Sequence, residues 1–261
     1  MKWPTSLLLI RHDVSAYNQM KVERAKDPLY QRFVKKFDQN WQSYVTRSLA
    51  LEVNEKWALK VSDPNTPLLE INSDRTVSTG RNLRLHEALP DVIFVSPYLR
   101  TKQTLEALKI GWPELSHVRV YEEERIREQN HGLASLYNDW RVYFALHPEQ
   151  KMLYDLDGAY WHTWQQGENR PMVRDRLRSW TITLSRDFAN RRVMYVGHHL
   201  GILCFRANHE RWDDSQFREV DEKDKPINCG VTKYAGIPNI GSNGRFALEY
   251  YNRDFSDFAA I

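Results

Sequence analysis

Residues 7–13 read LLLIRHD, an apolar run that leads directly into three polar side chains. Four consecutive apolar residues are typical of a strand that is buried on both faces, as in a parallel sheet. In open α/β sheets, ligands bind at the carboxyl ends of the strands. The order of residues therefore predicts that Arg11 and His12 lie at a sheet edge where chemistry takes place.

Further apolar runs alternate with segments of helical spacing. Strands are expected at 92–95, 118–121 and 193–196, and two more at 230–234 and 246–251 near the end of the chain. Ser78 is the expected N-cap of a helix that runs to about Ala88, and later helices are expected over about 98–110, 170–189 and 200–208. This alternation predicts an α/β fold, a three-layer α/β/α arrangement with a mainly parallel central sheet.

Two long segments do not fit a plain strand and helix alternation. Apolar residues at three- and four-residue spacings predict amphipathic helices in the first segment, and the second is rich in aromatic residues. We therefore expect a single domain over residues 1–261, with insertions at about 19–75 and 133–167 that form a helical and aromatic cap. The aromatic residues are expected either in the core of this cap or around a pocket for a ring-bearing substrate.

Composition excludes several classes of protein. The net charge is only +3, and basic residues alternate with acidic ones, so nucleic acid is not an expected partner. Cys204 and Cys229 are too few for a disulfide scaffold and have no metal-site spacing. No apolar stretch approaches the roughly 20 residues of a membrane span. We expect a cytoplasmic protein that does not bind membranes, and a homo-oligomer is left open.

Polar residues of catalytic type follow the predicted strands. Arg11, His12, Arg100, Glu128 and His198 each come at or just beyond a strand's carboxyl end. The topology would bring them together. Taken alone, each could be a surface residue, and for Glu128 this alternative is serious because residues 122–124 are also glutamates.

Four blocks of sequence resemble the histidine phosphatase superfamily, in its phosphoglycerate mutase-like branch. Residues 11–18, RHDVSAYN, are similar to the motif Arg-His-Gly-x-Ser-x-x-Asn that opens this family. Residues 96–104, SPYLRTKQT, resemble its second signature, and residues 127–132, REQNHG, resemble its acid-bearing motif. Residues 196–198, VGH, are similar to the strand that presents a second histidine. The blocks occur in the family's order.

The resemblance implies phosphoryl transfer through a phosphohistidine. His12 would be the nucleophile, and Arg11, Arg100 and His198 would hold the phosphoryl oxygens. Glu128 would protonate the leaving oxygen and later accept a proton from water, which requires a pKa raised by partial burial. Ser15 and Asn18 would contact the substrate. The arginines supply the positive charge, so neither a metal nor another cofactor is expected.

Two residues depart from the family pattern. Asp13 replaces the usual glycine after the first histidine, and His199 follows the second. Asp13 could raise the imidazole pKa of His12, bind a substrate hydroxyl, or serve as a turn or cap residue. For His199 three roles stay open: it could face the substrate, support a residue that does, or only pack.

These residues predict a metal-independent phosphohydrolase that acts on a small phosphorylated metabolite. A mutase that returns the phosphoryl group to the substrate is the nearest alternative. A non-catalytic regulatory protein that binds phosphate is another. A metal hydrolase that uses His198, His199 and Asp13 is disfavoured, because the neighbouring arginines would repel the metal.

Overall fold

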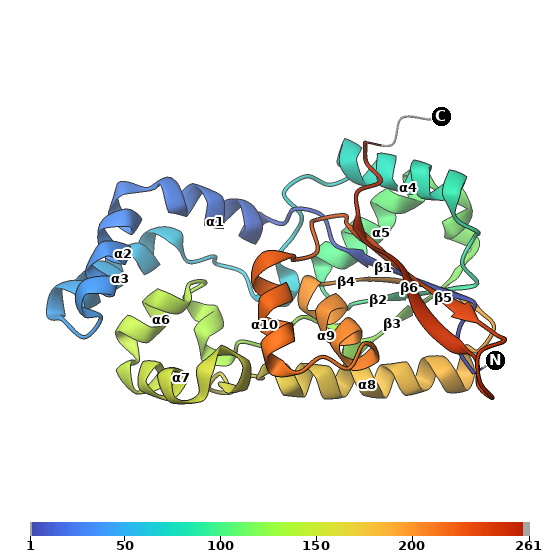
Figure 1. The fold of residues 1–261 in the computed structure, drawn as a ribbon. Helices are drawn as coiled ribbons and strands as arrows, with labels where there is room; N and C mark the ends of the chain where they lie inside the picture. Colours follow the sequence, from blue (N-terminus) through green and yellow to red (C-terminus); the bar gives the residue numbers. More distant parts are fainter. Residues whose placement is uncertain (1, 258–261) are drawn as a thin grey trace. The chain divides into compact units, whose positions relative to one another are not determined.

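The computed structural model describes residues 2–257 and contains a six-stranded sheet with the strand order β3-β2-β4-β1-β5-β6 (Figure 1). The strands are β1 (Ser6–Arg11), β2 (Val92–Val95), β3 (Arg119–Glu122), β4 (Arg192–Gly197), β5 (Val231–Ile237) and β6 (Arg245–Arg253). β3, β2, β4 and β1 are parallel, and β5 pairs antiparallel with β1 and with β6. The prediction of a mainly parallel α/β sheet is confirmed.

Helices cover both faces of this sheet. On one face, side chains of alternate positions in β1, β2 and β4, such as Ile10 and Met194, pack against α4 (Asp74–His86) and α5 (Leu99–Gly111). On the other face, Trp180 of α8 (Arg170–Asp187) contacts Tyr195 of β4 and Phe205 of α9 (His199–His209). Both faces of these strands are buried, so side chains on both faces are apolar. This explains the uninterrupted apolar runs in the sequence.

This sheet and its helices form one compact unit, made of residues 2–15, 67–128 and 173–257. A last helix, α10 (Asp214–Lys223), also belongs to it and begins at a capping box between Asp213 and Gln216. α10 was not among the predicted helices, because Phe217 and Val220 are the only apolar residues of its sequence. Short 3-10 helices are η1 (Asp63–Asn65), η2 (Pro113–His117), η3 (Glu124–Ile126) and η4 (Gly132–Leu136).

Residues 16–66 and 129–172 form a second compact unit. Its helices are α1 (Ala16–Lys26), α2 (Pro28–Asn40), α3 (Tyr44–Trp57), α6 (Trp140–Leu146) and α7 (Pro148–Trp161). Its own core joins aromatic side chains of α2 to those of α6, for example Phe33 to Phe144. Tyr143 and Phe144 are fully buried there, so part of the aromatic-rich segment 133–167 belongs to this core. The cap formed by insertions at about 19–75 and 133–167 stays a prediction.

One helix start differs from the prediction. α4 begins at Asp74, and its N-cap is Ser73, whose hydroxyl accepts from the Thr76 N–H. The prediction of Ser78 as the N-cap was wrong, because Ser78 lies in the second turn of this helix. Within residues 2–257, no helix is both long enough and apolar enough to span a bilayer.

Candidate active site

The parallel pairing of β1 with β4 places His12 beside His198. Arg11 is in register with Gly197, and the His12 N–H donates to the Gly197 carbonyl at 2.8 Å. The two imidazole rings follow these strands directly and meet edge to face, with centroids 5.3 Å apart. Both histidines are almost fully buried. The structure therefore brings together two side chains that are 186 positions apart in the sequence.

His12 has the state that a nucleophilic imidazole needs. Burial lowers its pKa well below the ordinary value for histidine, and the charges of Arg100, His198 and Arg11 lower it further. The ring is therefore neutral at neutral pH. Its Nδ1 lies 2.6 Å from the main-chain carbonyl of Asp13. Because a carbonyl only accepts, Nδ1 carries the proton and Nε2 carries the lone pair.

The two predicted arginines are anchored close to His12. Arg11 donates from Nη1 to the Pro226 carbonyl at 2.6 Å, while its buried Nε has no hydrogen-bond partner within residues 2–257. Arg100 lies in the first turn of α5, is only 5% exposed, and stacks its guanidinium 4.8 Å above the ring of Tyr98. Both contribute to the depressed pKa of His12. Two fixed positive charges therefore act on the nucleophile.

His198 is held by residues at the end of β2. Its Nε2 lies 2.8 Å from Oγ of Ser96, and its ring packs edge to face on Tyr98 at 5.0 Å between centroids. Burial lowers the pKa of His198 well below the ordinary value, with Arg100 as the next cause. Its buried Nδ1 has no hydrogen-bond partner among the described residues and lies 3.8 Å from Oε2 of Glu128. Nδ1 is thus the polar atom that His198 can offer to a ligand.

Glu128 reaches the same place from the loop after η3. Its Oε2 lies near both histidines that follow β4, and its side chain is 13% exposed. Arg176 of α8 fixes this loop by donating to the carbonyls of Arg125 and Arg127 at 2.7 Å each and of Glu128 at 3.0 Å. The glutamate predicted from its spacing to Gly132 therefore joins the predicted cluster.

Asp13 is built into the framework behind His12. Its Oδ1 accepts from the Val14 N–H at 2.7 Å, and its Oδ2 accepts from the hydroxyls of Ser73 and Thr76, the latter at 2.8 Å. The Asp13 N–H donates to Oγ1 of Thr104 at 3.1 Å. The carboxylate thus accepts hydrogen bonds from two hydroxyl groups at the start of α4, where a negative charge is favourable. The pKa of His12 is lowered overall by burial and the neighbouring charges, and the hydrogen bond to the Asp13 main-chain carbonyl opposes this only in part.

His199 lies at the first position of α9, between two carboxylates. Its Nδ1 is 3.5 Å from Oε2 of Glu128, and its Nε2 is 3.6 Å from Oδ1 of Asp221. Its side chain is 30% exposed. Burial alone would lower the pKa of His199, but Asp221 and Glu128 outweigh it and raise the pKa above the ordinary value.

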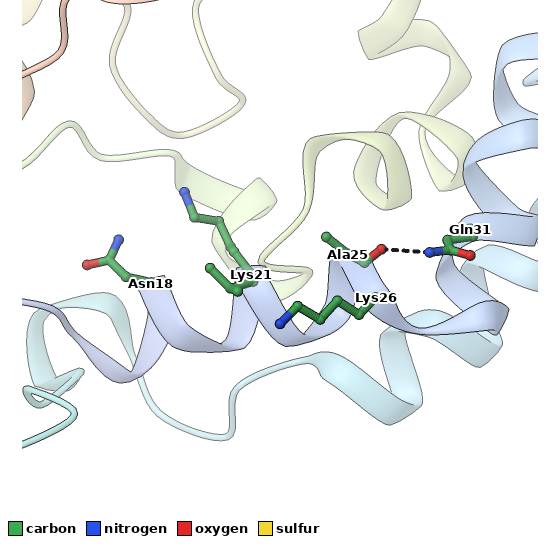
Figure 2. A pocket seen from close by; sticks show the side chains of 6 residues that line it. Asn18, Lys21, Ala25, Lys26 and Gln31 are labelled. Carbon is green, nitrogen blue, oxygen red and sulfur yellow. Dashed lines mark hydrogen bonds between the residues drawn. The ribbon is translucent and has the colours of Figure 1, made fainter.

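The two remaining predicted residues are Ser15 and Asn18. Ser15 is buried and forms an isolated bridge with Leu68. Asn18 belongs to α1 in the second unit, where it lines a shallow hollow with residues of α1 and α2 (Figure 2). The other residues that line this hollow are Lys21, Val22, Ala25, Lys26 and Gln31. No predicted catalytic residue is among them, and the substrate contacts of Ser15 and Asn18 stay predictions.

Sequence reasoning missed the residues that position the cluster. Ser96, Ser73, Thr76 and Thr104 contact it through hydroxyl groups, which any exposed serine or threonine also has. Arg176 was not among the predicted site residues, although it is half-buried and donates to three carbonyls. For Ser96, its place within the second family-like block was the one available signal.

The sequence of this chain matches a known family. Residues 55–235 match the histidine phosphatase superfamily (branch 1). The matched range includes Arg100, Glu128 and His198, and it begins after the His12 block. Two phosphoglycerate mutase-like proteins of Arabidopsis thaliana are each 25% identical, over 69% and 62% of this chain. The chain spans 61% and 50% of their lengths.

Solved structures share the fold. A mycobacterial glucosyl-3-phosphoglycerate phosphatase in complex with inorganic phosphate has a TM-score of 0.61 at 17% identity, covering 97% of this chain and 99% of its own. The alpha-ribazole phosphatase of Shigella flexneri has a TM-score of 0.62 at 13% identity, covering 95% of this chain and 96% of its own. At these identities the likeness shows the fold alone.

Proposed function

Because this chain belongs to the histidine phosphatase superfamily, as its four sequence blocks predicted, we propose that it is a phosphoric monoester hydrolase. It removes a phosphoryl group from a small phosphorylated metabolite through a phosphohistidine at His12. The observation that carries this proposal is the state of His12. The ring is neutral and buried, and its Nδ1 proton is held by the Asp13 carbonyl, so that Nε2 carries the lone pair.

In the first step, Nε2 of His12 attacks phosphorus and a P–N bond forms as the bond to the leaving oxygen breaks. Glu128 gives its proton to that oxygen, which leaves as an alcohol. The proton on Nδ1 stays in place, and the Asp13 carbonyl stabilises the positive charge that develops on the ring.

The charge of the transferring phosphoryl group is met by fixed cations. Phosphoryl transfer depends mainly on positioning and on neutralisation of the equatorial oxygens. Arg11 and Arg100 supply charges that do not depend on pH, and the free Nδ1 of His198 supplies a neutral contact. The amino ends of α5 and α9 lie at this end of the sheet and add favourable partial charge.

In the second step, water attacks the phosphohistidine. The ionised Glu128 accepts a proton from this water, the P–N bond breaks with its electron pair returning to Nε2, and inorganic phosphate leaves. His12 returns to the neutral form and Glu128 to the protonated form. No metal and no further cofactor enters either step.

The names of similar proteins support two versions of this chemistry. The structural neighbours include two phosphatases of small phosphorylated molecules, which supports hydrolysis. The curated relatives are named phosphoglycerate mutase-like, which keeps the mutase as the second candidate. In a mutase, the phosphoryl group on His12 would pass to a hydroxyl of the substrate.

Release of inorganic phosphate from a panel of phosphomonoesters tests the hydrolase. We expect release from at least one ester, and we expect Arg100→Ala to lower kcat/KM about 100-fold or more, because a fixed charge at the transition state is lost. Binding of the esters without phosphate release would indicate a phosphate-binding protein instead.

Incubation with 3-phosphoglycerate, with and without its bisphosphate primer, separates hydrolase from mutase. Isomerisation that requires the primer and releases no phosphate would overturn the hydrolase. A small phosphorylated molecule is the one partner that the proposal requires. A cytoplasmic location and self-association stay predictions.

A further inference from the structure

Glu128 does not lie alone among the acid groups of this site. A line of three ionisable side chains runs from Glu128 through His199 to Asp221, with a nitrogen to oxygen distance of 3.5 Å at the first link and 3.6 Å at the second. These distances are long for hydrogen bonds but suit groups that tighten when a substrate binds. Each ring nitrogen of His199 faces one carboxylate.

We propose that His199 and Asp221 position and replenish the proton of Glu128, so that the acid of this site is the Glu128–His199 pair. The proposal rests on the hydrolase function above and deepens it. His199 acts through Glu128 and is a positioning residue, and Asp221 acts through His199.

The exposure of the three side chains supports this order. Glu128 and Asp221 are 13% and 11% exposed, whereas His199 is 30% exposed. The imidazole is therefore the member of the line that exchanges protons with water most readily. Glu128 also faces His198, because its Oε2 lies 3.8 Å from Nδ1 of that histidine.

The protons balance as follows. Before the first step the pair holds one transferable proton, either on Glu128 or on Nδ1 of His199. When Glu128 protonates the leaving oxygen, that proton leaves with the alcohol. When water attacks the phosphohistidine, Glu128 accepts the water's proton and shares it with Nδ1 of His199, which restores the pair. Asp221 holds Nε2–H and takes up no proton.

The charges around His199 decide its protonation. Glu128 and Asp221 favour the imidazolium form of His199, whereas burial and the charge of Arg11 disfavour it. His198 faces the same site, but its lowered pKa keeps it neutral. Lys225 lies 4.0 Å from Asp221 and weakens the influence of that carboxylate. The balance raises the pKa of His199, so His199 keeps a second proton for the pair to higher pH than an ordinary histidine would.

The pair matters most for esters of aliphatic alcohols. An aliphatic alkoxide is strongly basic and leaves only with a proton, whereas p-nitrophenolate leaves without one. The substrate class that this site suits is therefore the phosphomonoester of an aliphatic alcohol, such as a sugar or polyol phosphate.

The test compares two esters across pH. kcat/KM is measured with p-nitrophenyl phosphate and with glycerol phosphate, for the wild type, His199→Gln, Asp221→Asn and the control Glu219→Gln. Glu219 lies on α10 as Asp221 does, but it is exposed and pairs with Lys223. Far-ultraviolet circular dichroism verifies the fold of each variant.

We expect His199→Gln to lower kcat/KM for glycerol phosphate about tenfold or more, with a change below about twofold for p-nitrophenyl phosphate. The alkaline limb of the pH profile with glycerol phosphate should move to lower pH in His199→Gln and in Asp221→Asn, and should not move in Glu219→Gln. In an NMR titration, Asp221→Asn should lower the pKa of His199.

Other results overturn the proposal. Equal losses with both esters, an unmoved alkaline limb, or an unchanged pKa of His199 in Asp221→Asn would assign His199 a packing role. Hydrolysis of the aryl ester but of no aliphatic ester would also contradict it. If the wild type hydrolyses neither ester and forms no phosphoenzyme, the hydrolase itself fails, which is a distinct result.

Discussion

The carbonyl oxygen of Asp13 lies 2.6 Å from Nδ1 of His12, and the carboxylate of the same aspartate is bound at the start of α4 by Ser73 and Thr76. One residue thus connects the orientation of the nucleophile to a helix terminus. The family-like motif has glycine at this position, so this chain has added a rigid support where the motif has none.

Removal of this support should impair both stability and turnover. Asp13→Ala removes the charged acceptor of the buried hydroxyls of Ser73 and Thr76, which should cost about 1–3 kcal/mol in the free energy of unfolding. kcat should fall about tenfold while KM changes little, because the carboxylate fixes the Asp13 main chain whose carbonyl orients His12, and it is itself engaged by Ser73 and Thr76. Denaturant unfolding and steady-state kinetics measure both effects.

The exposed neighbour Asp74 provides the control for this variant. It lies in the first turn of α4, so Asp74→Ala removes a carboxylate from the same helix terminus without touching His12. A similar loss of kcat in both variants would show that the helix terminus in general, and not Asp13, sets the activity.

Ser96 should determine the orientation of His198. Ser96→Ala removes the contact of 2.8 Å to Nε2 and leaves the ring free to turn about its side-chain bond. We expect the Kd for inorganic phosphate to rise about tenfold, as the Nδ1 contact is lost. Isothermal titration calorimetry measures it, with Ser185→Ala on the exposed side of α8 as the control. An unchanged Kd would mean that His198 does not contact phosphate.

Arg176 should control the position of Glu128. Its guanidinium donates to three carbonyls of the segment that carries Glu128, which a lysine cannot reproduce. Arg176→Met should lower kcat about tenfold or more, with Arg176→Lys between it and the wild type. Arg178→Met is the control, because Arg178 is exposed and pairs with Asp175 in its own helix. Equal activity of Arg176→Met and Arg178→Met would rule out this role.

The two buried histidines should make the fold sensitive to mild acid. His12 and His198 both have a pKa lowered mainly by burial, so below the ordinary histidine value the unfolded chain takes up protons that the folded chain does not. Stability should be unaffected by these groups above that value. As the pH falls below it, stability should decline by on the order of 1 kcal/mol per pH unit for each histidine.

Denaturant unfolding at a series of pH values measures this decline. In His198→Asn, one of these contributions is absent, so the slope of stability against pH should be shallower by on the order of 1 kcal/mol per pH unit in the same range. A slope that is the same in both proteins would show that His198 is protonated in the folded state.

The strand ends were predictable from the sequence, because an uninterrupted apolar run followed by polar residues has few other interpretations. These strand ends were sufficient to predict that Arg11, His12 and His198 lie at the carboxyl edge of the sheet. Arg100 and Glu128 depended on motif spacing, since one surface arginine or glutamate resembles another. The supports of the site were not predictable in this way. Ser73 and Ser78 are both suitable N-caps by residue type, and the contact of Ser73 with Asp13 is a tertiary one that the local sequence does not reveal.

Asp221 shows a second limit of sequence reading. It lies on α10, whose mostly polar sequence gives little apolar periodicity, and it meets His199 only through tertiary packing. Asp13 and His199 were recognised as unusual for their positions, but their contacts with α4 and α10 depend on residues that are distant in the sequence.

Trapping of the covalent intermediate tests the central claim most directly. The protein is mixed with a ³²P-labelled phosphomonoester that it hydrolyses, quenched rapidly in base, and analysed for protein-bound label. A phosphohistidine is stable in base and labile in acid, so the wild type and the exposed control His117→Ala should carry base-stable, acid-labile label, and His12→Ala should carry none. Label that persists in His12→Ala, or phosphate release by the wild type without any labelled protein, would contradict the account.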